Sequence, residues 1–82
     1  INYGLLIPKC NRVHTYFMKE NIDILGLDRN NKVIFKYENV FPNQIILINN
    51  NEKNTSVLEL PKNTSKSIKI NDILFFKNKY II

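Results

Sequence analysis

Four polar side chains stand among apolar residues and carry most of the chemistry that this sequence offers: His14, Thr15, Asp23 and Glu59. Each of the two carboxylates has an aliphatic residue on both sides in the chain, so each occupies a position where burial is expected. A buried polar group needs a hydrogen-bonding partner. The four side chains are therefore predicted to hold the fold together or to form a binding site.

Three interpretations of this set stay open. In the first, Asp23 and Glu59 accept hydrogen bonds from turn amides, from His14 and from Thr15, and so stabilise the fold. In the second, they line a pocket for a cationic or amine-bearing small molecule or an ion. In the third, His14 is the general base of a hydrolase-like enzyme and a carboxylate orients it. We predict a non-enzymatic domain that binds a small ligand or an ion, with the enzyme as the alternative.

Other chemistries lack the residues that they require. The chain has two glycines, which is too few for a phosphate-binding loop. Cys10 and His14 supply two of the roughly four ligands of a structural zinc site. Cys10 is the single cysteine, so an internal disulfide is excluded, and we expect a buried, inert thiol. No resident metal and no cofactor is predicted.

The charge of the chain does not indicate a nucleic-acid partner, although the formal net charge is +5. Asn, Ile and Lys are the commonest residues, Ala is absent, and Arg occurs only at positions 12 and 29, a bias typical of AT-rich coding sequence. The lysines are dispersed among glutamates and form no basic stripe. We predict a solvated basic surface and no nucleic-acid binding.

The elements that must position these side chains are short apolar runs rich in Ile, Val, Phe and Tyr, a pattern typical of strands. They lie at residues 3–7, 13–18, 22–27, 33–37, 45–48, 57–60 and 73–76. The predicted fold is all-β or nearly so: a small compact barrel-like or folded antiparallel sheet with hairpins and at most one short helical turn. At 82 residues it is expected to be one β-rich domain, 1–82.

Two hairpins are predicted from polar loops between these runs. Residues 28–32 join runs 22–27 and 33–37, with Asn30 or Asn31 at positive φ. Residues 49–54 join runs 45–48 and 57–60. Runs 45–48 and 73–76 are apolar on both faces, so we expect them to be covered on both sides. Alternation along 13–18 places His14 on one face and Thr15 on the other.

A longer series of motifs carries a family resemblance. The series is Pro8-x-Cys10-x-x-Val13-His14-Thr15-x-Phe17-Met18, then Ile22-Asp23-Ile24 and Leu27-Asp28, then Val57-Leu58-Glu59-Leu60 and Asp72-Ile73-Leu74. It resembles the uncharacterised prokaryotic family named domain of unknown function 192. The resemblance implies a compact β-rich fold and no established activity, cofactor or partner.

Three positions depart from the pattern of that family. Gly26 replaces a bulky apolar residue, and a glycine within a strand predicts a bulge or a close approach. Asn63 and Asn71 replace glycines. Because Asn tolerates positive φ better than other non-glycine residues, these turns are expected to keep their shape.

No apolar run approaches the length of a membrane-spanning helix, so no membrane span is expected. The lone thiol suits a reducing cytoplasm, which is the predicted location, although a chain that begins with Ile1 leaves export open. The apolar end of the chain, residues 80–82, suggests a third function, a protein-interaction or homodimeric assembly module, and the chain is expected to be a monomer or a weak homodimer.

Overall fold

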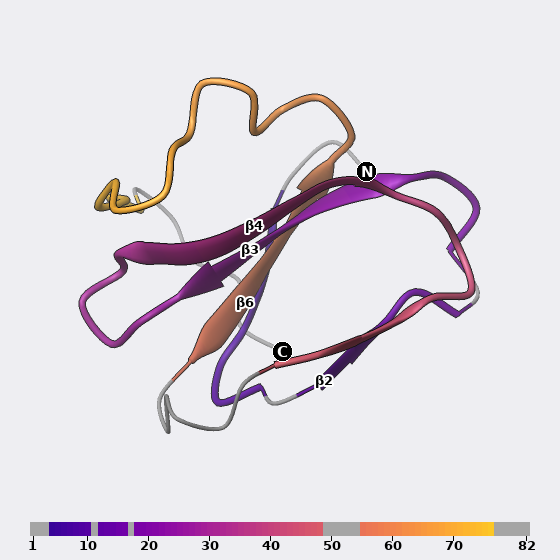
Figure 1. Cartoon of the computed structure of the whole chain (residues 1–82), viewed down its shortest axis with the longest axis horizontal. Helices are drawn as coiled ribbons and strands as arrows, with labels where there is room; N and C mark the ends of the chain where they lie inside the picture. The colour runs from indigo at the N-terminus through magenta and orange to yellow at the C-terminus, as the bar shows by residue number, and fades with distance from the viewer. Residues whose placement is uncertain (1–3, 11, 17, 49–54, 77–82) are drawn as a thin grey trace.

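Two antiparallel sheets form the fold in the computed structural model, which describes residues 4–10, 12–16, 18–48 and 55–76 (Figure 1). The larger sheet has the strand order β1 (Leu5–Ile7), β6 (Ser56–Pro61), β3 (Ile22–Leu27), β4 (Val33–Val40). The smaller sheet consists of β2 (Arg12–His14) and β5 (Ile45–Leu47). The all-β prediction is confirmed as a folded antiparallel arrangement, and the sheets do not close into a barrel in the described residues. Within those residues, no helix is long and apolar enough to cross a membrane.

The predicted hairpin between β3 and β4 is confirmed. Asn31 has φ 63°, and the Asp28 carboxylate oxygen Oδ1 accepts hydrogen bonds from the amides of Asn30 at 2.8 Å and Lys32 at 3.0 Å. A short acidic side chain thus satisfies the amides of the turn, while Asn31 takes the left-handed conformation that the reversal needs. Asn63 (φ 68°) and Asn71 (φ 77°) also adopt positive φ, as expected.

The second predicted hairpin is wrong in its pairing. β5 pairs with β2, with Val13 opposite Ile46, and β6 pairs with β1 and β3. The connecting loop, residues 49–54, lies outside the described residues. β6 is apolar enough to take a central place in the larger sheet, where both of its edges are paired, so sequence proximity to β5 did not decide its partner.

The seventh predicted strand, 73–76, is also wrong. Ile73 makes an isolated antiparallel bridge to Lys32, and residues 74–76 are not part of a strand. This segment still contributes apolar side chains, because Leu74 and Phe76 pack against the buried cluster of Leu6, Leu25 and Leu58. It covers the sheet without joining it.

The larger sheet is covered on both faces, and all six residues of β3 are buried. On one face Ile22 and Ile24 pack with Val13 of the smaller sheet and with Val57. On the other face Leu25 and Leu27 form a second cluster, against which Ile68, Leu74 and Phe76 pack. In Figure 1, β2 accordingly lies on one side of the larger sheet and the orange to yellow segment that follows β6 lies on the other. We call these the β2–β5 face and the C-terminal face.

Gly26 fits the predicted close approach. A Cβ atom at this position would lie 2.0 Å from Cε2 of Phe35, whose ring lies over the glycine on the β2–β5 face. The register of β3 with β4 also shifts between Gly26 and Leu27. The glycine therefore gives the Phe35 ring room to pack against the backbone of a buried strand.

Candidate functional site

The four predicted site residues do not form one cluster. In the pairing of β3 with β6, Asp23 lies opposite Leu60 and Ile24 lies opposite Glu59. Because neighbouring positions of a strand point to opposite faces, Asp23 belongs to the C-terminal face and Glu59 to the β2–β5 face. His14 and Thr15 come from the end of β2. The structure therefore contains two separate buried carboxylates instead of one polar site.

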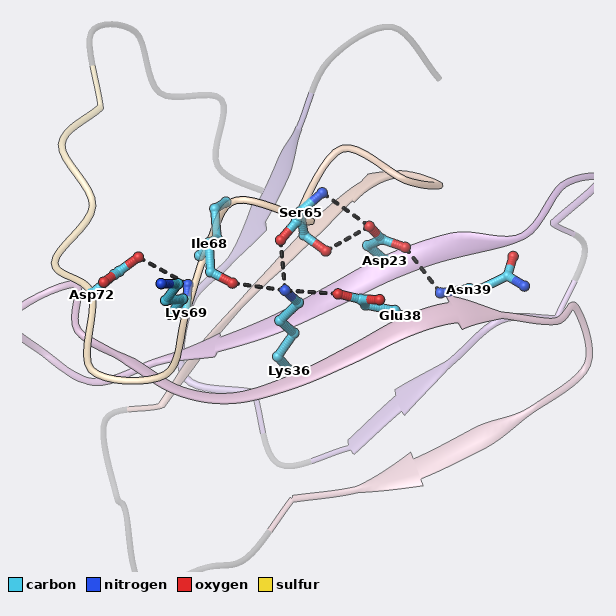
Figure 2. Close-up of polar contacts among 8 residues, drawn as sticks. All are labelled: Asp23, Lys36, Glu38, Asn39, Ser65, Ile68, Lys69 and Asp72. Carbon is cyan, nitrogen blue, oxygen red and sulfur yellow. Dashed lines mark hydrogen bonds and ion pairs between the residues drawn. The ribbon is translucent and has the colours of Figure 1, made fainter.

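Asp23 is fully buried and is hydrogen bonded through both oxygens. Its Oδ2 accepts from the hydroxyl of Ser65 at 2.6 Å and from the Ser65 amide at 3.1 Å, and its Oδ1 accepts from the Asn39 amide at 2.9 Å (Figure 2). Burial alone would raise the pKa of Asp23, but these donors outweigh burial and the pKa lies below its ordinary value. Asp23 joins the end of β4 and the turn after β6 to β3.

Lys36 extends this network along β4. Its Nζ donates to the carbonyl oxygens of Ser65 at 2.6 Å and Ile68 at 2.7 Å, and it forms an ion pair with Glu38 at 2.7 Å (Figure 2). Sequence reasoning missed Ser65, Lys36 and Asn39. A lysine flanked by Phe35 and Tyr37 within a strand was the available signal, because it points to the face opposite these aromatics. The network fastens the turn after β6 onto the sheet.

Thr15 is buried and has an architectural role. Its Oγ1 donates to the carbonyl oxygen of Phe41 at 2.8 Å and accepts from the Gln44 amide at 2.8 Å, while its own amide donates to the Gln44 carbonyl oxygen at 2.9 Å. These bonds join the end of β2 to the connection between β4 and β5. The hydroxyl is fully used by the backbone that it organises.

Glu59 differs from both of these residues. Only 8% of the residue is exposed, and its carboxylate accepts no hydrogen bond from the described residues. Because no buried side-chain oxygen in the described part of the chain lacks a partner, the Glu59 carboxylate oxygens keep contact with solvent. Burial raises the pKa of Glu59, and the electrostatic influence of His14 acts in the opposite direction without reversing the shift. Its neighbours across the strands are Leu5 and Ile24, which are aliphatic. The carboxylate is thus partly desolvated, without a hydrogen-bond donor from the described residues.

His14 is exposed, and its ring lies 5.2 Å from the ring of Tyr16, centroid to centroid, at an interplanar angle of 31°. The predicted alternation is confirmed, since Val13 and Thr15 are buried while His14 and Tyr16 are exposed. His14 lowers the pKa of Glu59 electrostatically, but the two side chains form no ion pair. The ion pair found in the described residues is Lys36–Glu38. The described residues also contain no group of three His, Cys, Asp or Glu side chains able to hold a metal ion.

Cys10 is half-buried, and its thiol donates a hydrogen bond to the carbonyl oxygen of Arg12 at 3.0 Å. It packs against the cluster of Val13, Ile22 and Ile48 on the β2–β5 face. The sequence led us to expect a buried thiol. A partly buried one with an apolar setting and a backbone acceptor has the same structural role.

Comparison with protein-family models, with curated proteins and with solved structures found no match to this chain. The resemblance to domain of unknown function 192 therefore stays a prediction.

Proposed function

We propose that this chain is a non-enzymatic binding domain whose ligand is a small organic cation, held through the Glu59 carboxylate. The observation that supports the proposal is that Glu59 is largely buried, accepts no hydrogen bond from the described residues and still reaches solvent with its carboxylate oxygens. Such a carboxylate loses part of its hydration and receives no hydrogen bond from the described residues in return. A ligand that brings a positive charge and N–H donors to this carboxylate compensates for that loss.

A protonated amine fits these residues better than a metal ion. Glu59 is flanked by aliphatic Leu5 and Ile24, and the described part of the chain offers no set of three metal-binding side chains. His14 is within electrostatic reach, and its ring pairs with that of Tyr16. In this arrangement Asp23 takes no part, since its oxygens are already occupied.

The proposal is tested by titrating the ¹⁵N-labelled protein with butylammonium and tetramethylammonium chloride, followed by amide chemical shifts at constant ionic strength. Butylammonium is expected to shift the amides of Leu5, Ile24 and Glu59 in a saturable way. The Glu59→Gln variant should lose this response, because the amide side chain carries no charge. Glu20→Gln, which removes an exposed carboxylate, should leave the response unchanged.

Three results would contradict the proposal. They are linear shifts without saturation, an equal response of the Glu59→Gln variant, and shifts confined to exposed acidic residues. A folded spectrum of Glu59→Gln is the internal control, since it shows that loss of binding is not loss of structure.

We also propose that the chain belongs to the family that it resembles. The positive φ of Asn63 and Asn71, at positions where that family carries glycine, supports this assignment, because both turns need a left-handed residue. A crystal structure of a member of that family is expected to show the strand order β1, β6, β3, β4 and turns at both equivalent positions. A different strand order in that family would contradict this family assignment.

A further inference from the structure

Within the described residues, the outer side of the smaller sheet carries exposed apolar side chains. The alternating residues Val13 and Ile46 turn inward to the core, and the residues between them turn outward. Of the outward residues on β5, Ile45 is 52% exposed and Leu47 is 75% exposed. The sequence predicts that run 45–48 is covered on both sides, and the structure shows that one side is open. Nothing in the described part of the chain explains why these two aliphatic side chains are exposed to water.

Further exposed side chains extend this surface. In the pairing of β2 with β5, Arg12 lies opposite Leu47 and His14 lies opposite Ile45. Tyr16 is exposed beside His14. We define the outer β2–β5 surface as these side chains, namely Arg12, His14, Tyr16, Ile45 and Leu47. Contiguous exposed apolar groups bordered by polar ones are typical of interaction surfaces.

The charge of this surface has a single sign. Residues 12–16 and 41–48 contain no aspartate or glutamate, whereas Arg12 and His14 stand directly opposite the two aliphatic residues of β5. A second copy of the chain would bring Arg12 toward another positive surface, and like charges that face each other across an interface oppose binding. An anionic membrane is a poor match as well, because each basic residue adds only about 1 kcal/mol and lipid-binding segments usually carry 4–8 of them.

We propose that the outer β2–β5 surface binds a segment of another protein that combines acidic residues with apolar anchors. The apolar anchors cover Ile45 and Leu47, and a carboxylate of the partner pairs with the Arg12 guanidinium. Arg and aromatic side chains are enriched where proteins meet, and planar guanidinium groups bind carboxylates through two hydrogen bonds. The proposal does not depend on the ligand assigned to Glu59.

Selection from a random dodecapeptide library displayed on phage tests the proposal with the intact chain as bait. The enriched peptides are expected to carry Asp or Glu within a few residues of at least two apolar side chains. A synthetic peptide of the enriched sequence should bind at least tenfold more weakly to Leu47→Ser and to Arg12→Glu. Phe75→Ser, which removes an apolar side chain that is 92% exposed at another position, is the matched control and should bind as wild type does.

Several results would overturn the proposal. They are the absence of enrichment, enriched peptides without acidic residues, and binding that survives both surface substitutions. Dimerisation that Leu47→Ser abolishes, seen by light scattering, would assign the surface to a second copy. Co-sedimentation with phosphatidylserine vesicles that depends on Leu47 would assign it to a membrane. Glu59→Gln should leave peptide binding unchanged, which separates this test from that of the proposed function.

Discussion

The two faces of the larger sheet treat a buried carboxylate in opposite ways. On the C-terminal face, Asp23 accepts three hydrogen bonds at 2.6–3.1 Å, and its pKa is lowered despite burial. On the β2–β5 face, Glu59 is buried between aliphatic neighbours without a donor among the described residues, and burial raises its pKa. Asp23 lies on β3 and Glu59 on the neighbouring strand β6, and their positions in the pairing of these strands differ by one residue.

The difference separates architecture from a candidate function. A carboxylate whose two oxygens both accept hydrogen bonds from the chain holds segments of the chain together and has little capacity left for a ligand. A carboxylate that is desolvated without compensation destabilises the fold, and proteins retain such groups mainly at functional sites. Both residues are buried, so burial alone does not distinguish them. They differ in the number of hydrogen-bond donors that the described residues supply to each carboxylate.

The largest expected effect is that of Asp23→Asn, which should lower the free energy of unfolding by about 3 kcal/mol, near the upper end for a buried hydrogen-bonded group. The new amide nitrogen would face either the Asn39 amide or the Ser65 amide, so one buried donor would lose its acceptor. Chemical denaturation measures the loss. Asp72→Asn is the control, because its carboxylate accepts one exposed hydrogen bond from the Lys69 amide. If Asp23→Asn were as stable as the wild type, the architectural role assigned to Asp23 would be wrong.

The same carboxylate predicts an acid limit for the fold. The pKa of Asp23 in the folded state lies below its ordinary value of 3.8, so its stabilising contribution is fully present above that value and is lost as the pH falls through the folded pKa. Unfolding free energy should therefore fall below about pH 4, and Asp23→Asn should flatten this part of the profile. A variant profile parallel to that of the wild type would contradict the assignment.

Gly26→Ala examines the packing of the β2–β5 face and should destabilise by about 2 kcal/mol. The new methyl group would meet the Phe35 ring at 2.0 Å, and Phe35 packs between the sheets. The double variant Gly26→Ala/Phe35→Leu is expected to recover part of the loss, since the smaller side chain vacates that space. If both variants lose the same stability, the Phe35 ring is not the reason that this position requires glycine.

The sequence located every described strand, although it also predicted a strand at 73–76 that the structure does not have. Each described strand lies at a run identified from β-branched and aromatic residues, the alternation of β2 was correct, and Asn31 has the predicted positive φ. These features depend on neighbours within a few residues. They are local consequences of side-chain branching, strand alternation and turn chemistry, which a single sequence displays directly.

Strand partners and the division of the polar set depend on contacts that are distant in the chain. The apolar pattern of β5 suits a hairpin with β6 as well as the observed pairing with β2. Asp23 and Glu59 look equivalent in the sequence, since each stands between aliphatic residues. Only the register, which places Glu59 opposite Ile24, separates them onto different faces. The donors of Asp23 lie 16 and 42 positions away, and nothing local to Asp23 indicates them.

Asn31→Val is a reference for stability losses that come from neither face of the larger sheet. Because β-branched residues are disfavoured in the left-handed conformation, valine at φ 63° should cost about 1 kcal/mol of unfolding free energy. The turn between β3 and β4 serves both sides of the sheet, so this loss belongs to neither carboxylate. Denaturant midpoints at several pH values should fall by a constant amount, without a new pH dependence. A pH-dependent loss would show that the hairpin is coupled to one of the two carboxylates, and the effects assigned to Asp23 and Glu59 would then need to be separated again.

The smallest expected effect has the opposite sign. Glu59→Gln keeps the shape of the side chain and removes a charge that burial disfavours, so we expect a gain of about 0.5–1 kcal/mol at pH 7. The folded pKa of Glu59 lies above its ordinary value of 4.5, so its favourable contribution is complete below that value and is lost as the pH rises through the folded pKa. The gain of the variant should therefore be near zero at pH 4 and should grow toward neutral pH. A constant gain would point to packing instead of charge. A loss of stability at pH 7 would mean that the ionised carboxylate is compensated within the chain, and Glu59 would join Asp23 as an architectural residue.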